Sequence, residues 1–184
     1  MNRLLLFPGA GSSSTHSSLL AIEAAVAPTP CVRADFPYRL AARKAPDRPP
    51  VLLQAVRDAA APLLTRRDTL VLGGRSMGGR ICSLAVADEA DPLPARGLVL
   101  ISYPLHPPGK PDTLRVEHFP RLTVPCLFIS GTKDTFGTPG ELTRWTATIP
   151  GPVTHEWMDG KGHDLKGCDA RIASLVAAWI PTIL

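Results

Sequence analysis

Six short apolar runs recur along the 184-residue chain, and they limit its possible folds more than any other feature. They cover residues 3–7, 31–36, 69–73, 97–101, 125–130 and 152–157. Most of the runs are continuous rather than alternating, which is typical of strands buried on both faces of a parallel sheet. We therefore interpret them as six strands of one sheet.

Segments with helical spacing fill most of the intervals between these runs. We expect helices at residues 15–27, 50–65, 77–90, 139–147 and 169–180. In the last of them, Ile172, Val176 and Trp179 fall on one face. Strand and helix alternate without a break in composition, so the sequence predicts a single α/β domain over residues 1–184.

Right-handed crossovers restrict how such a chain can wind. If the first two strands run outward and the third returns beside the first, the result is a doubly wound, mainly parallel six-stranded sheet with strand order 2-1-3-4-5-6. Sheets of this kind bind ligands at the carboxyl ends of the strands, where the order reverses. We therefore expect the loops after residues 7 and 73 to lie side by side at a binding site.

Charge and cysteine spacing argue against several classes of protein. The formal net charge is +4, but the basic residues are spread from Arg3 to Arg171 instead of forming the dense stripe of a nucleic-acid binder. The four cysteines include no CxxC pair, so we interpret them as free, mostly buried thiols rather than as a zinc site. The first apolar run is shorter than the roughly 7–15 residues of a secretory signal. We expect a cytoplasmic protein that binds neither membrane nor nucleic acid.

The strongest local signal is Gly74-Arg75-Ser76-Met77-Gly78, a G-x-S-x-G motif between a predicted strand and a predicted helix. Small residues at both ends let a strand turn abruptly into a helix and present the serine hydroxyl at the sheet edge. Chance alone would give roughly 0.06 such matches in a chain of this composition. The alternative is a glycine-rich turn in which Ser76 only caps the helix.

A nucleophilic serine needs a base, and the base needs an acid that orients it. Asp134 follows the fifth apolar run, His163 follows the sixth, and a parallel sheet would bring both to the same edge as Ser76. We therefore predict that Ser76, His163 and Asp134 form a catalytic triad. Weaker candidates are Asp159 as the acid and His16, His118 or His155 as the base.

An acyl-transfer site also needs amide donors for the oxyanion, commonly from the residue after the nucleophile and from the loop after the first strand. Met77 would supply the first and Ala10 the second, with Gly11 as the next candidate. The same loop permits another interpretation, because Gly9-x-Gly11 followed by a helix and Asp35 resembles a dinucleotide-binding fingerprint. Ser14 stands in place of the third glycine of this fingerprint, so we predict no organic cofactor. Dinucleotide binding is kept as the weaker alternative for this loop.

Polar side chains follow the second and fourth apolar runs at the same expected edge. They are Tyr38, Arg39, Arg43, Lys44, His106 and Lys110. They could form a rim that binds an anionic or polar acyl group, or only a solvated surface. Together with Arg75 of the motif, Tyr38 and His106 are our candidate substrate-binding residues.

These motifs resemble the α/β-hydrolase superfamily. More narrowly they resemble the small dienelactone-hydrolase-like family of testis-expressed protein 30, which is related to regulatory subunit 3 of the non-specific-lethal complex. The stretch that is most specific to this family is Leu105-His106-Pro107-Pro108-Gly109-Lys110, with further matches at residues 36–38, 46–48, 131–137 and 162–163. The resemblance implies that Ser76, Asp134 and His163 act as nucleophile, acid and base.

The resemblance also implies a minimal hydrolase core without a large cap. Residues 102–124 contain five prolines and are expected to form a stiff surface loop beside an open, shallow site. The expected activity is hydrolysis of a small-molecule carboxylic ester, thioester or lactone through an acyl-enzyme, without a metal. The alternative is an interaction module that keeps the fold but does not use the triad.

Overall fold

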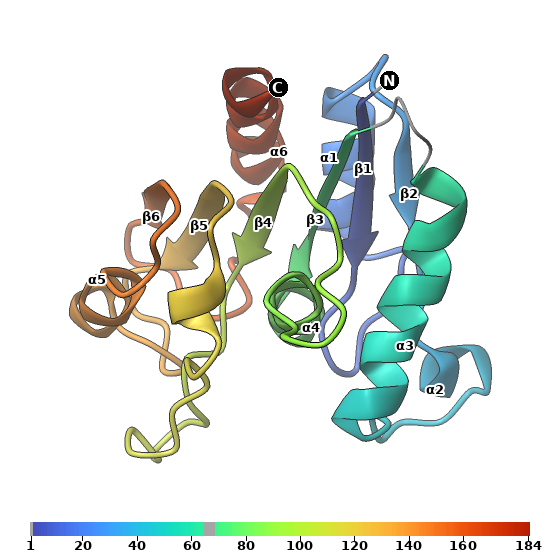
Figure 1. Ribbon diagram of the computed structural model, residues 1–184. Coiled ribbons are helices and arrows are strands. Elements are labelled where there is room, and N and C mark those ends of the chain that lie inside the picture. The colour runs from blue at the N-terminus through green and yellow to red at the C-terminus, as the bar shows by residue number, and fades with distance from the viewer. Residues whose placement is uncertain (1, 65–68) are drawn as a thin grey trace.

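The computed structural model describes residues 2–64 and 69–184. In these ranges the sheet consists of β1 (Asn2–Phe7), β2 (Cys31–Arg33), β3 (Thr69–Arg75), β4 (Gly97–Ile101), β5 (Cys126–Gly131) and β6 (Val153–Met158). The strand order is β2-β1-β3-β4-β5-β6, and every neighbouring pair is parallel (Figure 1). The predicted fold class and strand order are therefore confirmed.

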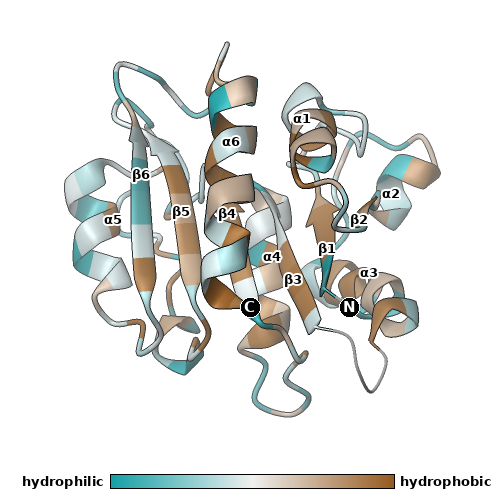
Figure 2. Cartoon of the chain, turned by 90° about the horizontal axis from the view of Figure 1, so that it is seen from above, coloured by the Kyte–Doolittle hydropathy of each residue, from teal (hydrophilic) through white to brown (hydrophobic). Residues whose placement is uncertain are grey.

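Helices cover both faces of this sheet. They are α1 (Ser17–Ala25), α2 (Pro37–Leu40), α3 (Pro49–Ala60), α4 (Met77–Val86), α5 (Pro139–Thr146) and α6 (Asp169–Trp179), with short 3-10 helices η1 (Ala61–Leu63), η2 (Phe119–Arg121) and η3 (Ile180–Ile183). Helices α1 and α6 pack on the face seen in Figure 2, and α3, α4 and α5 pack on the other. None of the helices in the described ranges has the length and apolar character needed to cross a membrane.

The continuous apolar runs supply two separate cores. Successive side chains of a strand point to opposite faces, so a strand covered on both sides needs apolar residues at every position. In β1, Leu4 and Leu6 belong to the core beneath α1 and α6, whereas Leu5 and Phe7 belong to the core beneath α3 and α4. All four side chains are fully buried. This double burial explains why the central strands could be located from the sequence.

The helix ends differ from the predicted ones for local reasons. Helix α4 stops at Val86, because the Asp88 carboxylate accepts hydrogen bonds from the amides of Ala90 and Asp91 and forms a turn. Helix α3 ends at Ala60, and position 65 of the predicted helix lies outside the described residues. The four-residue helix α2 was not predicted; Pro37 occupies its first turn, where a missing amide proton costs nothing.

The segment between β4 and β5 corrects the expectation of a surface loop. Its buried apolar side chains are Tyr103, Leu105, Val116, Phe119 and Leu122. The Tyr103 hydroxyl donates a 2.7 Å hydrogen bond to the Arg115 carbonyl and ties the start of the segment to its middle. The prolines stiffen the segment, but the apolar residues between them anchor it in the core. Among the described residues the only helix in this segment is η2, which agrees with a core that lacks a large cap.

Candidate active site

Strand β3 turns directly into α4 at Ser76, whose φ of +45° lies in the left-handed region. The turn packs so closely on β1 that only glycine fits on either side of it. A Cβ atom at Gly74 would collide with the Phe7 carbonyl, and one at Gly78 would lie 2.5 Å from the same oxygen. The Ser76 amide donates a 2.7 Å hydrogen bond to the carbonyl of Ile101 at the end of β4. The G-x-S-x-G motif thus forms the predicted sharp turn at the carboxyl edge of the sheet.

Three side chains from separate loops meet at this edge. Nε2 of His163 lies 2.9 Å from Oγ of Ser76, and Nδ1 lies 3.1 and 2.9 Å from the two carboxylate oxygens of Asp134. An ionised carboxylate can only accept, so Nδ1 carries the proton in the neutral imidazole and Nε2 accepts from the serine hydroxyl. Ser76 makes no side-chain cap to α4, so the interpretation of this residue as a simple helix cap is not supported.

The carboxylate and the imidazole are both held in place. Asp134 is 1% exposed, and its Oδ1 accepts a 2.8 Å hydrogen bond from the Phe136 amide. The Phe136 ring stacks on the imidazole of His163 with 3.9 Å between ring centroids and an interplanar angle of 26°. The imidazole therefore has one ring face covered and both nitrogens engaged.

The alternative acid and bases have other partners. Asp159 is exposed and accepts a 3.2 Å hydrogen bond from the Thr132 hydroxyl. The other histidines contact the Ser18 amide (His16), the Ser83 hydroxyl (His118) and the Thr146 hydroxyl (His155). Burial, reinforced by the positive charges of Arg80 and Arg121, lowers the pKa of His118 to about 4. Among these candidates, the structure brings only Asp134 and His163 together with Ser76.

The loop after β1 lies beside the turn that carries Ser76, as the strand order predicts. Ala10 and Met77 both line the cavity over Ser76, whereas Gly11 does not. A 3.1 Å hydrogen bond from the Ser12 amide to the Gly9 carbonyl closes the loop. Met77 is the first residue of α4, and amides at this position have no partner within their own helix.

Asp35, the acidic residue of the dinucleotide alternative, is already engaged. Its two carboxylate oxygens accept 2.7 Å hydrogen bonds from the amide and the hydroxyl of Ser14. These bonds tie the end of β2 to the loop after β1. A dinucleotide site would need this carboxylate for the ribose hydroxyls. The geometry therefore gives the dinucleotide interpretation no support.

A cavity of about 360 Å³ opens over Ser76 and His163. Its lining residues are Ala10, Ser76, Met77, Arg80, Pro104, Arg115, Phe136 and His163. This volume is near the lower end of the roughly 300–1,000 Å³ of small-molecule sites, which favours a small ligand.

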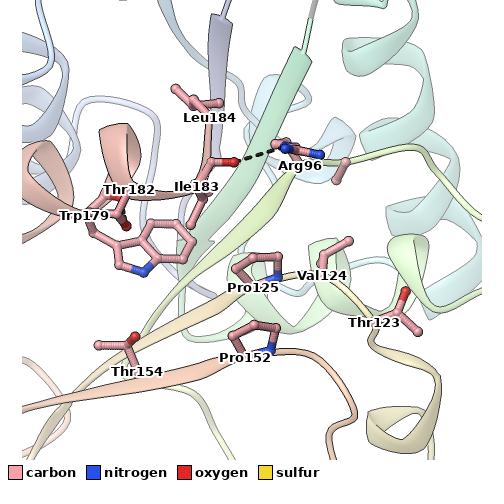
Figure 3. Close-up of a pocket in the computed structure, with 11 residues that line it drawn as sticks. Arg96, Thr123, Val124, Pro125, Pro152, Thr154, Trp179, Thr182, Ile183 and Leu184 are labelled. Atoms are coloured by element: carbon pink, nitrogen blue, oxygen red, sulfur yellow. Dashed lines mark hydrogen bonds between the residues drawn. The ribbon is translucent and has the colours of Figure 1, made fainter.

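A second cavity, of about 580 Å³, lies at the opposite edge of the sheet, where β4, β5 and β6 begin (Figure 3). Its lining includes Trp179, Pro125 and Thr154, and none of the described residues that line it is a His, Cys, Asp or Glu. The guanidinium of Arg96, which lines this cavity, donates a 2.9 Å hydrogen bond to the Ile183 carbonyl. The described lining of the second cavity therefore offers no nucleophile paired with a base, and the cavity over Ser76 is the candidate active site.

The model of a family described as an alpha/beta hydrolase domain matches residues 1–178 of the chain. The chain belongs to this alpha/beta hydrolase family. Among solved structures, Est1E from Butyrivibrio proteoclasticus with bound ferulic acid has a TM-score of 0.79 at 14% identity, covering 100% of the hydrolase and 89% of Est1E. The type II thioesterase BorB from the borrelidin biosynthetic cluster has a TM-score of 0.73 at 16% identity, with 100% and 93% covered. The RedJ thioesterase from Streptomyces coelicolor has a TM-score of 0.68 at 21% identity, with 100% and 85% covered.

Arg75, a predicted substrate-binding residue of the hydrolase, does not line the cavity. Its side chain is buried on the other side of the turn, where Nη1 donates to the Ser18 hydroxyl and Nη2 donates a 2.8 Å hydrogen bond to the Asp164 carbonyl. Burial lowers the pKa of Arg75. Because Asp164 directly follows His163, these bonds connect the turn that carries the serine with the loop that carries the imidazole.

Tyr38 and His106, the other two predicted substrate-binding residues, also lie outside the cavity lining. Tyr38 is fully buried and its ring stacks on Phe36, with 6.4 Å between centroids. His106 is 5% exposed, and its Nε2 lies 3.5 Å from a carboxylate oxygen of Glu141. Tyr38 follows β2 and His106 follows β4, which brings both to the expected edge of the sheet, but both side chains point into the protein.

Four residues that line the cavity of the hydrolase were not predicted: Arg80, Pro104, Arg115 and Phe136. Arg80 could have been found, because it lies four positions after Ser76 and residues at this spacing share a helix face. Arg115 and Pro104 carry no such signal, since their positions depend on how the segment between β4 and β5 folds.

The cysteines of the hydrolase do not take part in the site. All four are free, with Cys31 partly buried and the others buried. Burial raises the pKa of the Cys31 and Cys126 thiols to about 12, which keeps them protonated and unreactive at neutral pH. Residues 2–64 and 69–184 contain no group of three or more His, Cys, Asp or Glu placed to hold a metal ion.

Proposed function

We propose that this hydrolase cleaves small carboxylic esters, thioesters or lactones, with Ser76 as the nucleophile. The observation that carries the proposal is the unbroken chain of hydrogen bonds from Ser76 through His163 to the buried Asp134. Serine, imidazole and carboxylate in this order are the machinery by which acyl-transfer enzymes activate a hydroxyl group. The chain lies in a cavity of the size that a small substrate needs.

Acylation begins when Oγ of Ser76 attacks the carbonyl carbon of the substrate. Nε2 of His163 takes the hydroxyl proton as the new C–O bond forms, and the carbonyl oxygen becomes an oxyanion. The amides of Met77 and Ala10 are the donors for that oxyanion, and a single donor of this kind is worth about 10²–10³ in kcat. The tetrahedral intermediate then expels the alkoxide or thiolate, which takes the proton from His163 and leaves as alcohol or thiol.

Deacylation repeats these steps with water in place of the serine hydroxyl. His163 takes a proton from the water as its oxygen attacks the acyl-enzyme, and then returns the proton to Oγ when the acid product leaves. Asp134 keeps the imidazole in the tautomer that accepts at Nε2 and stabilises the imidazolium that forms in each half of the reaction. The scheme uses no metal or organic cofactor.

Names of similar structures agree with this substrate class. BorB and RedJ are described as thioesterases, and Est1E is described with ferulic acid, a carboxylic acid, bound. The narrower likeness to the dienelactone-hydrolase-like family and the cytoplasmic location remain predictions.

A panel of para-nitrophenyl esters and acyl thioesters of increasing chain length tests the proposal. We expect multiple turnovers for at least one short-chain substrate. For activated esters we also expect an initial burst of nitrophenol, because acylation by the good leaving group outpaces hydrolysis of the acyl-enzyme. Folded protein that turns over no member of either series would favour the interaction module instead.

A further inference from the structure

Two positively charged side chains share the cavity over Ser76. Arg80 lies on α4, one helical turn after Ser76, and Arg115 lies on the segment between β4 and β5. Within residues 2–64 and 69–184, neither guanidinium forms a hydrogen bond or an ion pair. The Nε atom of Arg80 is buried from solvent without a partner. Guanidinium groups in such surroundings usually face a carboxylate or a phosphate.

The two arginines also affect each other. Burial lowers the pKa of Arg115, and the positive charge of Arg80 lowers it further. Arg115 is held in this position by its backbone, whose amide donates a 2.9 Å hydrogen bond to the Leu105 carbonyl and whose carbonyl accepts from the Tyr103 hydroxyl. The fold therefore keeps two like charges at one small cavity, and an anion bound between them would relieve their repulsion.

The other walls of the cavity limit the rest of the ligand. Ala10, Met77, Pro104 and Phe136 are apolar, and the volume of about 360 Å³ favours a small ligand. An anionic end would thus be separated from the ester carbonyl by a short apolar linker. By contrast, Arg57 shows the pairing that arginines of this chain can find on the protein, because its guanidinium forms ion pairs with Asp88 and Asp91.

We propose that Arg80 and Arg115 select a substrate with an anionic group, such as a carboxylate, close to its ester or thioester carbonyl. This inference rests on the proposed function and narrows its substrate class to anionic esters. Both residues bind the substrate away from the reacting atoms. The anion could belong to the acyl part or to the leaving group, and both arrangements share the same recognition chemistry.

Matched pairs of esters test the selection. For the acyl part, mono-para-nitrophenyl adipate is compared with the ester in which an isopropyl group replaces the free carboxylate. For the leaving group, para-acetoxybenzoate is compared with para-isopropylphenyl acetate. We expect kcat/KM to favour the anionic member of at least one pair by about tenfold or more, because a hydrogen bond to a charged group is stronger than a neutral one. The favoured pair identifies the part that carries the charge.

Arg80→Gln, Arg115→Gln and the double variant should bring this ratio close to one, and Arg115→Lys should keep part of it. Arg171→Gln, an exposed arginine on α6, is the matched control and should retain the full ratio. If Arg80→Gln on α4 folds poorly, Arg115→Gln on the segment between β4 and β5 still tests whether the arginines select an anionic substrate. Equal kcat/KM within both pairs, or a ratio that survives in the double variant, would overturn the inference while leaving the proposed hydrolase activity standing.

Binding without turnover separates the two proposals further. Calorimetric titration of Ser76→Ala with the same esters should show the anionic member of the favoured pair binding about tenfold more tightly than its neutral partner. Adding Arg115→Gln should remove the difference. If the anionic ester binds more tightly but wild-type protein hydrolyses none of these esters, only the proposed hydrolase activity is contradicted. If the anionic and neutral esters bind equally, only the anion site is contradicted.

Discussion

Ser76→Ala is expected to lower kcat/KM for the best ester by about 10⁴-fold or more, since no other group at the site can form the acyl-enzyme. The alanine keeps the Cβ atom, so the turn between β3 and α4 is expected to form as before. Steady-state hydrolysis by wild type and variant gives the ratio, and circular dichroism checks that both are folded. Residual activity comes from the oxyanion donors and from substrate binding.

Ser174→Ala is the control for this substitution. Ser174 is exposed on α6, on the face of the sheet away from α4, so its loss should leave turnover unchanged. Turnover by Ser76→Ala within tenfold of the wild-type value would show that another group performs the reaction.

Asp134→Asn is expected to lower kcat by about 10⁴-fold, because the amide cannot hold the imidazole in the tautomer that accepts from the serine hydroxyl. The buried oxygen of Asp134 that accepts from the Phe136 amide can be replaced by the amide oxygen of asparagine, so we expect the loop to keep its fold. The measurement is kcat with the ester that gives the highest turnover.

Asp159→Asn is its partner experiment. Asp159 leaves β6 four positions before His163, but its side chain is exposed and contacts Thr132. We expect this variant to keep wild-type kcat. The opposite pattern, with Asp159→Asn inactive and Asp134→Asn active, would mean that the orienting carboxylate has been misassigned.

The strands and the meeting of Ser76, His163 and Asp134 could be predicted because each depends on a short-range pattern. Continuous apolar runs such as the one in β4 are required by burial on both faces, and parallel pairing brings every carboxyl end to one edge. Once Ser76, Asp134 and His163 follow three strands of one such sheet, their convergence needs no knowledge of individual loops. The turn at Ser76 could also be predicted locally, because the glycines on either side of it are required by close packing on β1.

The lining of the cavity could not be predicted in this way. Tyr38 and His106 follow strands at the correct edge, yet packing turns their side chains inward, and the sequence pattern does not encode that direction. Arg115 reaches the cavity because buried Tyr103 and Phe119 fold the segment between β4 and β5 back onto the core. The position of Arg115 is thus set by contacts between residues that lie far apart in the segment. The prolines indicate that the segment is stiff, but they do not indicate how it folds.

Labelling with a fluorophosphonate, followed by proteolysis and mass spectrometry, tests most directly whether His163 and Asp134 activate Ser76. The probe forms a stable bond with an activated serine and spares ordinary hydroxyl groups. The account predicts one adduct per chain, located on the peptide that contains Ser76, and none on the intact Ser76→Ala variant. Folded wild-type protein that stays unlabelled, or that carries the adduct on a different serine, would contradict it.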